Sequence, residues 1–342
     1  MIVIPGLTRD PAFLATRTEQ KRDPGFRRDD GVAITRTEYI LDESPSSQHC
    51  GVVAIVGAPN AGKSTLVNAL VGQKVAITSP KAQTTRTRVM GVAIEGDAQI
   101  VLVDTPGIFA PKRRLDRAMV QAAWGGAQGA DLIALIVDGK AGLGPKMEPI
   151  IAALKARPER KWLILNKVDI AIKEKLLVHT QRLYEEIDFA ETFFVSAATG
   201  DGLAELKSAF AKAMPEGPWH FPEDQVSDAT DRMLAAEITR EQLYHQLHAE
   251  LPYAAAVDTE QYKEREDGSV EIHQQILVAR PTQRAIVLGK GGQRLKEIGS
   301  KARAELATLL GCKVHLYLHV KVKEDWEDDR FIYRDIGLDW VD

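Results

Sequence analysis

Two loops rich in glycine and lysine lie far apart in this chain of 342 residues. The first has the sequence GAPNAGKST at residues 57–65, and the second has the sequence GKGG at residues 289–292. Because glycine has no Cβ, backbone N–H groups in such loops can approach an anion closely. Both loops therefore predict phosphate binding, and the elements around them decide whether they bind the same ligand.

The first loop fits the pattern G-x-x-x-x-G-K-[ST] between the apolar run GVVAIV and the helical stretch STLVNALVG. A preceding strand and a following helix are the context that this motif requires, and a match by chance is the alternative. We expect Lys63 to reach the β and γ oxygens of a nucleotide and the Ser64 hydroxyl to bind Mg²⁺. The residues predicted to hold the nucleotide here are Gly57, Ala58, Pro59, Asn60, Ala61, Gly62, Lys63, Ser64 and Thr65.

Three further residues are suited to the metal and the γ-phosphate. The sequence VDTPG places Asp104 where it can hold the Mg²⁺ shell through water, and Gly107 where its N–H can meet the γ-phosphate. A hydroxyl must join the shell when the γ-phosphate is present, and we choose Thr85, with Thr84 as the alternative. We interpret the stretch that carries it, SPKAQTTRTRVMG, as a mobile segment outside the core.

The choice of base depends on Asn166, Lys167 and Asp169 in the sequence NKVD. The Asp169 carboxylate can accept hydrogen bonds from N1–H and N2–H₂ of guanine, whereas adenine has no donor there, so the site disfavours ATP. Asn166 would tie the phosphate loop to the base loop, and the stem of Lys167 would cover the purine. Ser196 and Ala197 follow the next strand, where the Ala197 N–H could contact O6 of the base. A surface turn is the alternative for NKVD alone, but the four motifs in this order predict GTP binding.

Short apolar runs alternate with helical stretches between residues 52 and 195, which indicates βαβ units on a largely parallel sheet. The motifs follow the runs, at the carboxyl ends of the predicted strands, where open α/β sheets bind ligands. Pro215, Pro218 and Pro222 are tolerated by neither a helix nor a central strand, so we place a domain boundary there. We expect a disordered extension at 1–47 and a GTPase domain at 48–217 with the Ras-like P-loop NTPase fold.

The chain resembles the Era family of ribosome-assembly GTPases from about residue 48 to residue 342. The resemblance is carried by GAPNAGKST, KAQTTRTR, DTPG, NKVD and SA, followed by the second glycine loop. It implies GTP and GDP as ligands, Mg²⁺ as cofactor, and action on pre-30S ribosomal particles through the 3′ end of small-subunit ribosomal RNA. It also implies a monomer, and it leaves open a peripheral association with the inner face of the cell membrane.

Catalysis is less clearly encoded than binding. Ras-like enzymes have a glutamine after D-x-x-G that orients the attacking water, but here that position is Ile108, whose side chain cannot do so. Similar GTPases bind K⁺ through an asparagine of the phosphate loop, here Asn60, and a cation there would offset charge that develops in the transition state. The alternative is that Asn60 only forms a hydrogen bond within the loop. We predict slow intrinsic hydrolysis, with Lys63, Thr85, Gly107 and Asn60 as the catalytic residues.

The second loop cannot be another phosphate loop of this type, because GKGG lacks the G-K-[ST] ending. A helix, two strands near 254–263 and 270–278, the G-x-x-G loop, a second helix and the final strand KVHLYLHVKV have the order of a type II KH domain. We therefore predict an α+β KH domain at 218–342, whose loop clamps the backbone of single-stranded RNA. An ordinary turn before a helix is the alternative.

Local charge supports RNA binding in this part of the chain. Residues 221–342 carry a net charge of −7, but residues 280–323 hold 10 Lys and Arg against 2 Asp and Glu, a net charge of +8. A basic groove on an acidic body is the expected footprint of a nucleic-acid site, and a solvated basic helix face is the alternative. The predicted RNA contacts are Arg280, Arg284, Gly289, Lys290, Gly291, Gly292, Arg294, Lys296 and Lys321.

Composition argues against several other classes of protein. No apolar stretch approaches the roughly 18 to 20 residues of a membrane span, and the N-terminus lacks a secretory pattern, so we expect a cytoplasmic location. Cys50 and Cys312 lie too far apart for a metal motif or a disulfide framework. An RNA-modifying enzyme would need a reactive cysteine or another cofactor site, and a membrane-signalling GTPase would favour a lipidation motif. Neither feature is evident.

Overall fold

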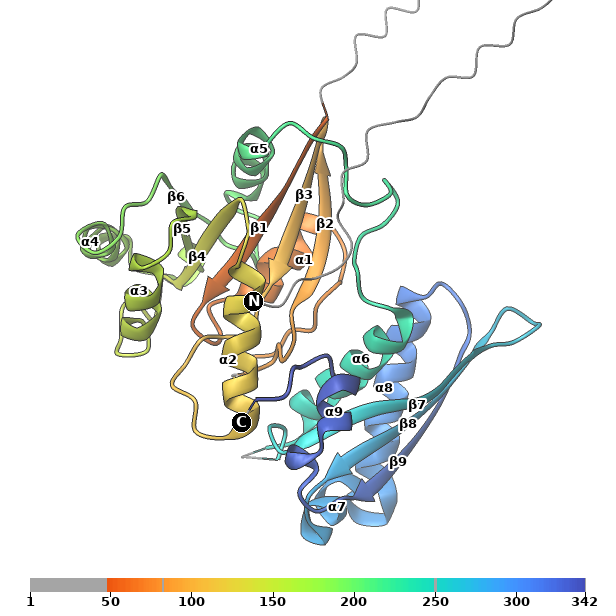
Figure 1. Cartoon of the computed structure of the whole chain (residues 1–342). Coiled ribbons are helices and arrows are strands. Elements are labelled where there is room, and N and C mark those ends of the chain that lie inside the picture. Colours follow the sequence, from red (N-terminus) through yellow and green to blue (C-terminus); the bar gives the residue numbers. More distant parts are fainter. Residues whose placement is uncertain (1–47, 82, 249–250, 342) are drawn as a thin grey trace, which may run out of the picture. The chain divides into compact units, whose positions relative to one another are not determined.

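The computed structural model describes residues 48–341 with the exception of 82, 249 and 250. The extension predicted to be disordered at 1–47 lies outside the described residues. The described part contains one sheet of six strands and one of three (Figure 1). Among its helices, none has the length and apolar character that crossing a bilayer requires.

The larger sheet forms the centre of the GTPase domain and has the strand order β2-β3-β1-β4-β5-β6. All neighbouring strands are parallel except β2 and β3, so the prediction of a largely parallel sheet is confirmed. The central strands are buried along most of their length, as expected for a sheet covered by helices on both faces. The strands are β1 His49–Gly57, β2 Val89–Glu95, β3 Ala98–Asp104, β4 Leu132–Asp138, β5 Arg160–Asn166 and β6 Glu191–Phe194.

Helices cover both faces of this sheet. On one face, α1 and α5 contribute Leu66, Val67 and Phe210 to a core shared with the strands. On the other face, α2, α3 and α4 contribute Ala123, Ile150 and other apolar residues to a second core. These helices are α1 Lys63–Val71, α2 Arg114–Ala127, α3 Glu148–Lys155, α4 Lys173–Tyr184 and α5 Leu203–Ala213, and a 3₁₀ helix η1 spans Val168–Ile170.

The sequence did not predict the strand β2, because its first residues fall in the stretch interpreted as mobile. Gly91 also interrupts the apolar pattern of this strand. A Cβ on Gly91 would lie 2.8 Å from Cγ2 of Val71 and 3.0 Å from Cγ1 of Val67, both on α1. Glycine therefore allows α1 to pack closely on β2, and this packing rather than strand propensity determines the residue.

The smaller sheet has the order β7-β8-β9, with β7 antiparallel and β9 parallel to β8. On one face of it, Leu243 of α6 and Ile298 of α8 pack against Ile276 of β8. The order of elements confirms the predicted type II KH domain. Its elements are α6 Asp231–Gln246, β7 Ala255–Glu264, β8 Val270–Val278, α7 Pro281–Leu288, a 3₁₀ helix η2 at Lys290–Gly292, α8 Gln293–Leu309 and β9 Val314–Val322.

The proline-rich segment between α5 and α6 lies along the edge of the larger sheet. The backbone of Ser227 pairs with Gly91 of the edge strand β2. The side chain of Gln99 donates to the Phe221 carbonyl at 2.8 Å and accepts from the Phe221 N–H at 3.0 Å. The segment thus covers a strand edge that would otherwise expose unpaired backbone groups. The domain boundary placed between residues 217 and 218 lies within this segment and stays a prediction.

The last elements of the described chain also contact the GTPase domain. They are η3 Trp326–Asp328 and α9 Arg330–Asp335. Trp326 and Tyr333 are fully buried in a cluster with Leu115 and Met119 of α2. The two domains therefore share an apolar contact as well as the covalent connection.

Candidate functional site

The first glycine-lysine loop connects β1 to α1 and places Lys63 at the first residue of the helix. Lys63 is 6% exposed, and its Nζ donates to the carbonyl oxygens of Gly57 at 3.3 Å and Ala58 at 3.1 Å. Burial lowers the pKa of the Lys63 amine to about 8, and the charge of Asp104 opposes this shift. The amine is therefore mostly protonated at pH 7, next to a helix N-terminus that already favours anions.

Asn166 connects the phosphate loop to the base loop. Its Nδ2 donates to the Ala61 carbonyl at 2.9 Å, and its Oδ1 accepts from the Ala197 N–H at 3.0 Å. A Cβ on Gly62 would lie 2.2 Å from this Nδ2, and Gly62 has a φ of +94°, so the position requires glycine. The predicted link through Asn166 is thus present. Because the Ala197 N–H is engaged with Asn166, its contact with a base stays a prediction.

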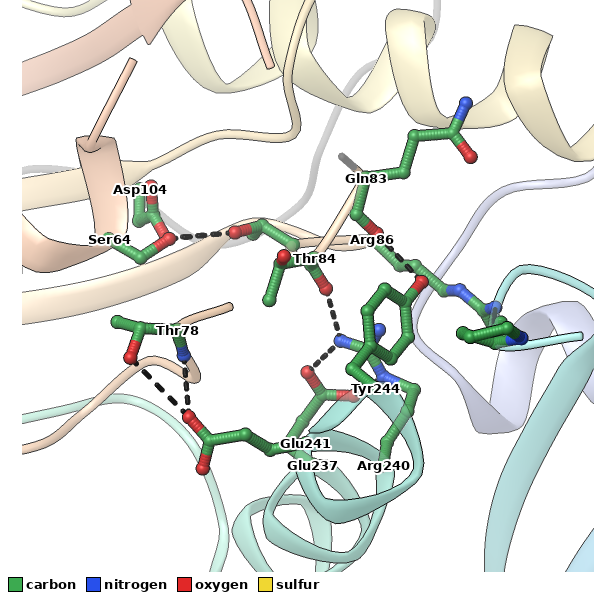
Figure 2. Close-up of polar contacts among 12 residues, drawn as sticks. Ser64, Thr78, Gln83, Thr84, Arg86, Asp104, Glu237, Arg240, Glu241 and Tyr244 are labelled. Carbon is green, nitrogen blue, oxygen red and sulfur yellow. Dashed lines mark hydrogen bonds and ion pairs between the residues drawn. The ribbon is translucent and has the colours of Figure 1, made fainter. Parts of the chain in front are cut away.

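Oxygen atoms of Ser64, Thr85 and Asp104 lie together. The Ser64 Oγ lies 2.6 Å from Oδ2 of Asp104 and 2.8 Å from Oγ1 of Thr85, and the latter lies 3.3 Å from the same Oδ2. Ser64 and Asp104 are labelled in Figure 2, close to the segment that carries Thr84. The Thr84 hydroxyl donates instead to the Lys81 carbonyl at 2.9 Å, so the geometry favours the choice of Thr85 over Thr84.

The carboxyl group of Asp104 is fully buried, and its Oδ1 has no hydrogen-bond partner in the described part of the chain. Burial raises the pKa of Asp104 to about 6, although the charge of Lys63 and the two hydroxyl groups act in the opposite direction. Leaving a buried carboxylate oxygen without a partner is costly. A hard cation would satisfy it, and three oxygen ligands are of the type that Mg²⁺ prefers. The residues present therefore fit Mg²⁺.

Gly107 and Ile108 lie against the phosphate loop. A Cβ on Gly107 would lie 2.8 Å from Cα of Pro59, so the two backbones approach as closely as only glycine allows. The Ile108 N–H donates to the Gly57 carbonyl at 3.1 Å, and the Ile108 side chain is 3% exposed in the core. A side chain buried in this way cannot orient a water molecule, as the sequence predicted.

Lys167 and Asp169 lie on the side of the site assigned to the base. The Lys167 Nζ donates to the Asn60 carbonyl and to Oδ2 of Asp138, both at 2.7 Å. The sequence analysis missed Asp138, although it ends β4 in the same register in which Asn166 ends β5. The Asp169 carboxylate is exposed and makes no hydrogen bond or ion pair with the described residues, so both of its oxygens are accessible.

Asn60 and Ser196 form hydrogen bonds of their own. Asn60 has a φ of 65° and donates from Nδ2 to the Pro80 carbonyl at 2.9 Å, so its side chain contacts a segment outside the phosphate loop. The Ser196 Oγ accepts from the Thr199 N–H at 3.2 Å and so closes a turn beside the base loop. Ser196 is fully buried, so its side chain holds the turn that follows β6.

The phosphate loop, residues of the segment 77–85 and Lys167 of the base loop line a pocket of about 560 Å³. Most of the residues predicted from the sequence around the phosphates line it. His245 of α6 lines it as well, and no motif pointed to a residue so distant in the chain. The pocket is therefore formed by the GTPase domain together with one helix of the KH domain.

The interpretation of SPKAQTTRTRVMG as a segment outside the core is wrong for three of its described residues, Thr85, Arg86 and Gly91, the last of which is buried in β2. Thr85 is 8% exposed and Arg86 is 4% exposed. The Arg86 guanidinium donates to the backbone carbonyls of Ala255 at 2.9 Å and Tyr253 at 3.1 Å. The polar composition of the stretch predicted exposure to solvent, but the guanidinium of Arg86 finds its hydrogen-bond partners in the KH domain.

The second glycine-lysine loop joins α7 to α8. Gly289, Gly291 and Gly292 have φ values of +70°, +60° and +78°. Lys290 is exposed, and no atom lies within 4 Å of a Cβ built on Gly291 or Gly292. The loop therefore presents its backbone openly to solvent, with three of its four residues at positive φ values that glycine favours.

A groove of about 390 Å³ lies beside this loop, between α8 and β9. Two predicted RNA contacts, Gly292 and Lys296, line it. The sequence analysis missed Arg303, although it follows Lys296 by seven residues and so lies two turns along the same face of α8. The other lining residues are Leu295, Gly299, Ser300, Leu316 and Leu318.

The other predicted basic contacts do not line this groove. Arg294 donates to a carbonyl of α7 at 2.7 Å, and Arg284 donates to a carbonyl of β9 at 3.2 Å, so both connect neighbouring elements. Arg280 is exposed at the start of α7. Side chains alternate along a strand, so Lys321 lies on the opposite face of β9 from Leu318 and outside the groove.

These features define a P-loop GTPase followed by a KH domain. The family model described as a 50S ribosome-binding GTPase matches residues 52–167, and the KH domain model matches residues 250–327. The GTPase Era of Erythrobacter litoralis is 63% identical to this chain over 296 residues, which are 85% of this chain and 97% of the relative. The chain belongs to the Era family of GTPases.

Other members of the family agree over the same extent. The GTPase Era of Afipia carboxidovorans is 56% identical over 303 residues, which cover 89% of this chain and 98% of the relative. A solved structure of Era in complex with MgGDPNP and nucleotides 1506–1542 of 16S ribosomal RNA has a TM-score of 0.80 at 40% identity, covering 85% of this chain and 99% of its own. A variant of Aquifex aeolicus Era bound to GDP·AlF₄⁻ gives the same values. GTP hydrolysis is accordingly the activity of this chain.

Proposed function

We propose that this GTPase binds GTP with Mg²⁺ in the pocket of the first loop and binds the 3′ end of small-subunit ribosomal RNA in the groove of its KH domain. The nucleotide part is carried by one pocket that the phosphate loop, Thr85 and Lys167 line, with Asp104 bonded to Ser64 and Asn166 bonded to the Ala61 carbonyl directly behind it. The RNA part is supported by the open glycine loop beside a basic groove and by the Era relative that was solved with 16S ribosomal RNA. Binding to pre-30S particles follows from that RNA target.

Ser64 and Thr85 would bind Mg²⁺ directly, and Asp104 would hold its shell through water. When bound, Mg²⁺ neutralises charge on the β and γ oxygens and holds them in place. Lys63 would exchange the carbonyls of Gly57 and Ala58 for phosphate oxygens. An anion stabilises the ammonium form, so GTP binding raises the pKa of Lys63 above its present value of about 8. The Gly107 N–H would contact the γ-phosphate.

Asp169 would select guanine through its two accessible carboxylate oxygens, while Asn166 holds the base loop against the phosphate loop. No side chain at the Ile108 position orients the attacking water, which supports slow intrinsic turnover. Asn60 would offer its Oδ1 to K⁺ while its Nδ2 stays bonded to the Pro80 carbonyl. The monomeric state, the cytoplasmic location and the peripheral contact with a membrane stay predictions.

The RNA part can be tested by titrating the purified full chain with a labelled RNA of the 3′-terminal small-subunit sequence and with a scrambled RNA of equal composition. We expect tighter binding to the first, because single-stranded readout requires base contacts in addition to phosphate contacts. Arg303→Glu, in the groove, should weaken binding strongly, whereas Lys321→Glu, on the opposite face of β9, should act weakly. Equal affinity for both RNAs, or equal loss in both variants, would contradict the proposed groove.

A further inference from the structure

The segment that carries Thr85 is held by α6, a helix of the KH domain. The backbone carbonyl of Gln83 accepts from the Tyr244 Oη at 3.0 Å, and that of Thr84 accepts from the Arg240 Nη2 at 2.5 Å. Figure 2 shows both contacts, with Tyr244 and Arg240 reaching from α6 to the segment. The two peptide groups immediately before Thr85 are therefore fixed from outside the GTPase domain.

The residue after Thr85 is fixed as well. Arg86 inserts its guanidinium among the carbonyls of Pro252, Tyr253 and Ala255, at distances between 2.9 and 3.3 Å. It is almost fully buried, so solvent does not compete for these hydrogen bonds. The segment is thus anchored to the KH domain on both sides of Thr85.

A second group of contacts holds the start of the same segment. Glu241 of α6 is buried, accepts from the Thr78 N–H at 2.7 Å and pairs with Lys74. The Lys81 Nζ donates to the carbonyls of Tyr244 and Leu247 at the end of α6. These contacts span the segment from residue 74 to residue 86, while its Thr85 hydroxyl lies next to Ser64 and Asp104.

The donors on α6 are themselves held rigidly. Arg240 is 3% exposed and forms an ion pair with Glu237 one turn away, which holds its guanidinium in one orientation. Tyr244 is fully buried and packs edge-on against Tyr253 at 5.8 Å between ring centroids. Fixed donors lose little conformational entropy when they hold a partner, so they determine where the Thr85 peptide lies.

We propose that Arg240 and Tyr244 are positioning residues for GTP hydrolysis, because they hold Thr85 at the site of Mg²⁺ and the γ-phosphate. The proposal rests on the proposed binding of GTP and Mg²⁺. Neither residue lines the pocket itself, so each acts only through the backbone of residues 83 and 84. The KH domain therefore completes the part of the GTPase site that distinguishes GTP from GDP.

Tyr244→Phe is the most conservative test, since it removes one hydroxyl and keeps the buried ring. Loss of one hydrogen bond should weaken the affinity for a non-hydrolysable GTP analogue with Mg²⁺ by roughly 3- to 10-fold and lower kcat similarly, with GDP affinity unchanged. Arg240→Lys should act in the same direction, because lysine keeps the charge but loses the fork geometry. Tyr262→Phe is the matched control, since its Oη contacts Asp231 at the far end of α6.

A double-mutant cycle with Thr85→Ala separates positioning from a general loss of stability. If Tyr244 acts through Thr85, Tyr244→Phe has no further effect on GTP-analogue affinity in the Thr85→Ala background. An effect that persists there, or an equal loss of GDP and GTP-analogue affinity, would overturn the proposal. So would wild-type values in Tyr244→Phe and Arg240→Lys. A wild-type chain that fails to prefer GTP with Mg²⁺ would instead refute the proposed function itself.

Discussion

Both glycine-lysine loops combine flexible glycines with a lysine, but they present these residues in opposite ways. Lys63 is buried and bonded to its own loop, whereas Lys290 is exposed. Asn166 fills the space beside Gly62, whereas no atom lies within 4 Å of a Cβ on Gly291. The first loop is packed against its neighbours beside a pocket that suits one polyphosphate, and we call it the closed site. The second loop, the open site, is exposed to solvent where a longer chain can pass. Loop composition thus predicts an anion, but burial and neighbours determine which anion binds.

The largest expected effect is on base selection by Asp169 at the closed site. In Asp169→Asn, an amide replaces a carboxylate that accepts from two guanine donors, so GTP affinity should fall on the order of 10³-fold. Xanthosine nucleotides should gain affinity, because their base presents an acceptor that the amide nitrogen can meet. Competition titrations with GDP and xanthosine diphosphate measure both changes. Unchanged GTP affinity would remove Asp169 from base selection.

The motifs allowed the closed site to be predicted almost completely, because its residues lie in short stretches at the ends of strands. Asn166 joins the phosphate and base loops as its place in NKVD indicated. The contacts of Arg86, Arg240 and His245 could not be predicted, because each depends on two domains meeting. Their types, two arginines and a histidine in polar surroundings, are typical of a solvated surface.

The open site was predicted less completely for a different reason. The order of the elements around the G-x-x-G loop predicted the KH domain, but the basic residues were chosen by charge alone. Helical periodicity would have added Arg303 beside Lys296, and strand alternation would have removed Lys321 from the groove. Local net charge indicates which region of the chain binds RNA, whereas the position of a residue on its helix or strand shows whether that residue can line the groove.

Substitutions confined to the second loop test whether RNA binding can be lost without a change in GTP affinity. Replacing Lys290 and Gly291 with Asp puts carboxylates where phosphates must approach, and like charges at an interface cost several kcal/mol, so RNA affinity should fall on the order of 100-fold. The added Cβ also strains a position with a φ of +60°. GTP affinity should stay within a few tenths of a kcal/mol of wild type, as expected for distant sites.

Two titrations on the same purified variant give the result, one with a labelled guanine nucleotide and one with the 3′-terminal RNA. Retained RNA affinity would mean that the loop is only a turn before α8. Loss of both affinities would show that the variant is misfolded or that the two sites are coupled through the contact between the domains. Lys321→Asp/Gly311→Asp provides a control with equal added charge, since Gly311 also has a positive φ and open space around it.

Acid should weaken metal binding at the closed site. The pKa of Asp104 is raised to about 6 by burial, and Mg²⁺ favours the ionised carboxylate. Binding of Mg²⁺ with a GTP analogue should therefore weaken by about tenfold between pH 7.5 and pH 5, as a proton competes for Asp104. The γ-phosphate also titrates near this range, but Asp104→Asn retains that contribution. An equal pH response in wild type and Asp104→Asn would exclude Asp104 as its source.

The same raised pKa has a consequence for stability without ligand. A carboxyl whose folded pKa exceeds its unfolded value opposes folding once it is ionised. The contribution of Asp104 to the free energy of unfolding should therefore decrease as the pH rises from about 4 to about 6. Asp104→Asn should flatten this part of the stability curve, measured by urea unfolding at fixed ionic strength, and a curve unchanged by the substitution would contradict the raised pKa.

The smallest expected effect concerns K⁺, and it tests how the closed site contributes to catalysis beyond binding GTP. Asn60 is exposed and already uses its Nδ2 to bind the Pro80 carbonyl, so only its Oδ1 could serve K⁺. If it does, hydrolysis should rise about fivefold when Na⁺ is replaced by K⁺ at constant ionic strength, the equivalent of about 1 kcal/mol of barrier. Asn60→Ala should lose this response, whereas Asn60→Asp should keep an oxygen ligand and part of it. Initial rates of phosphate release at saturating GTP measure the effect. Equal rates in both salts would leave Asn60 with its bond to Pro80 alone, and the charge that develops on the γ-phosphate would then be balanced by Lys63 and Mg²⁺.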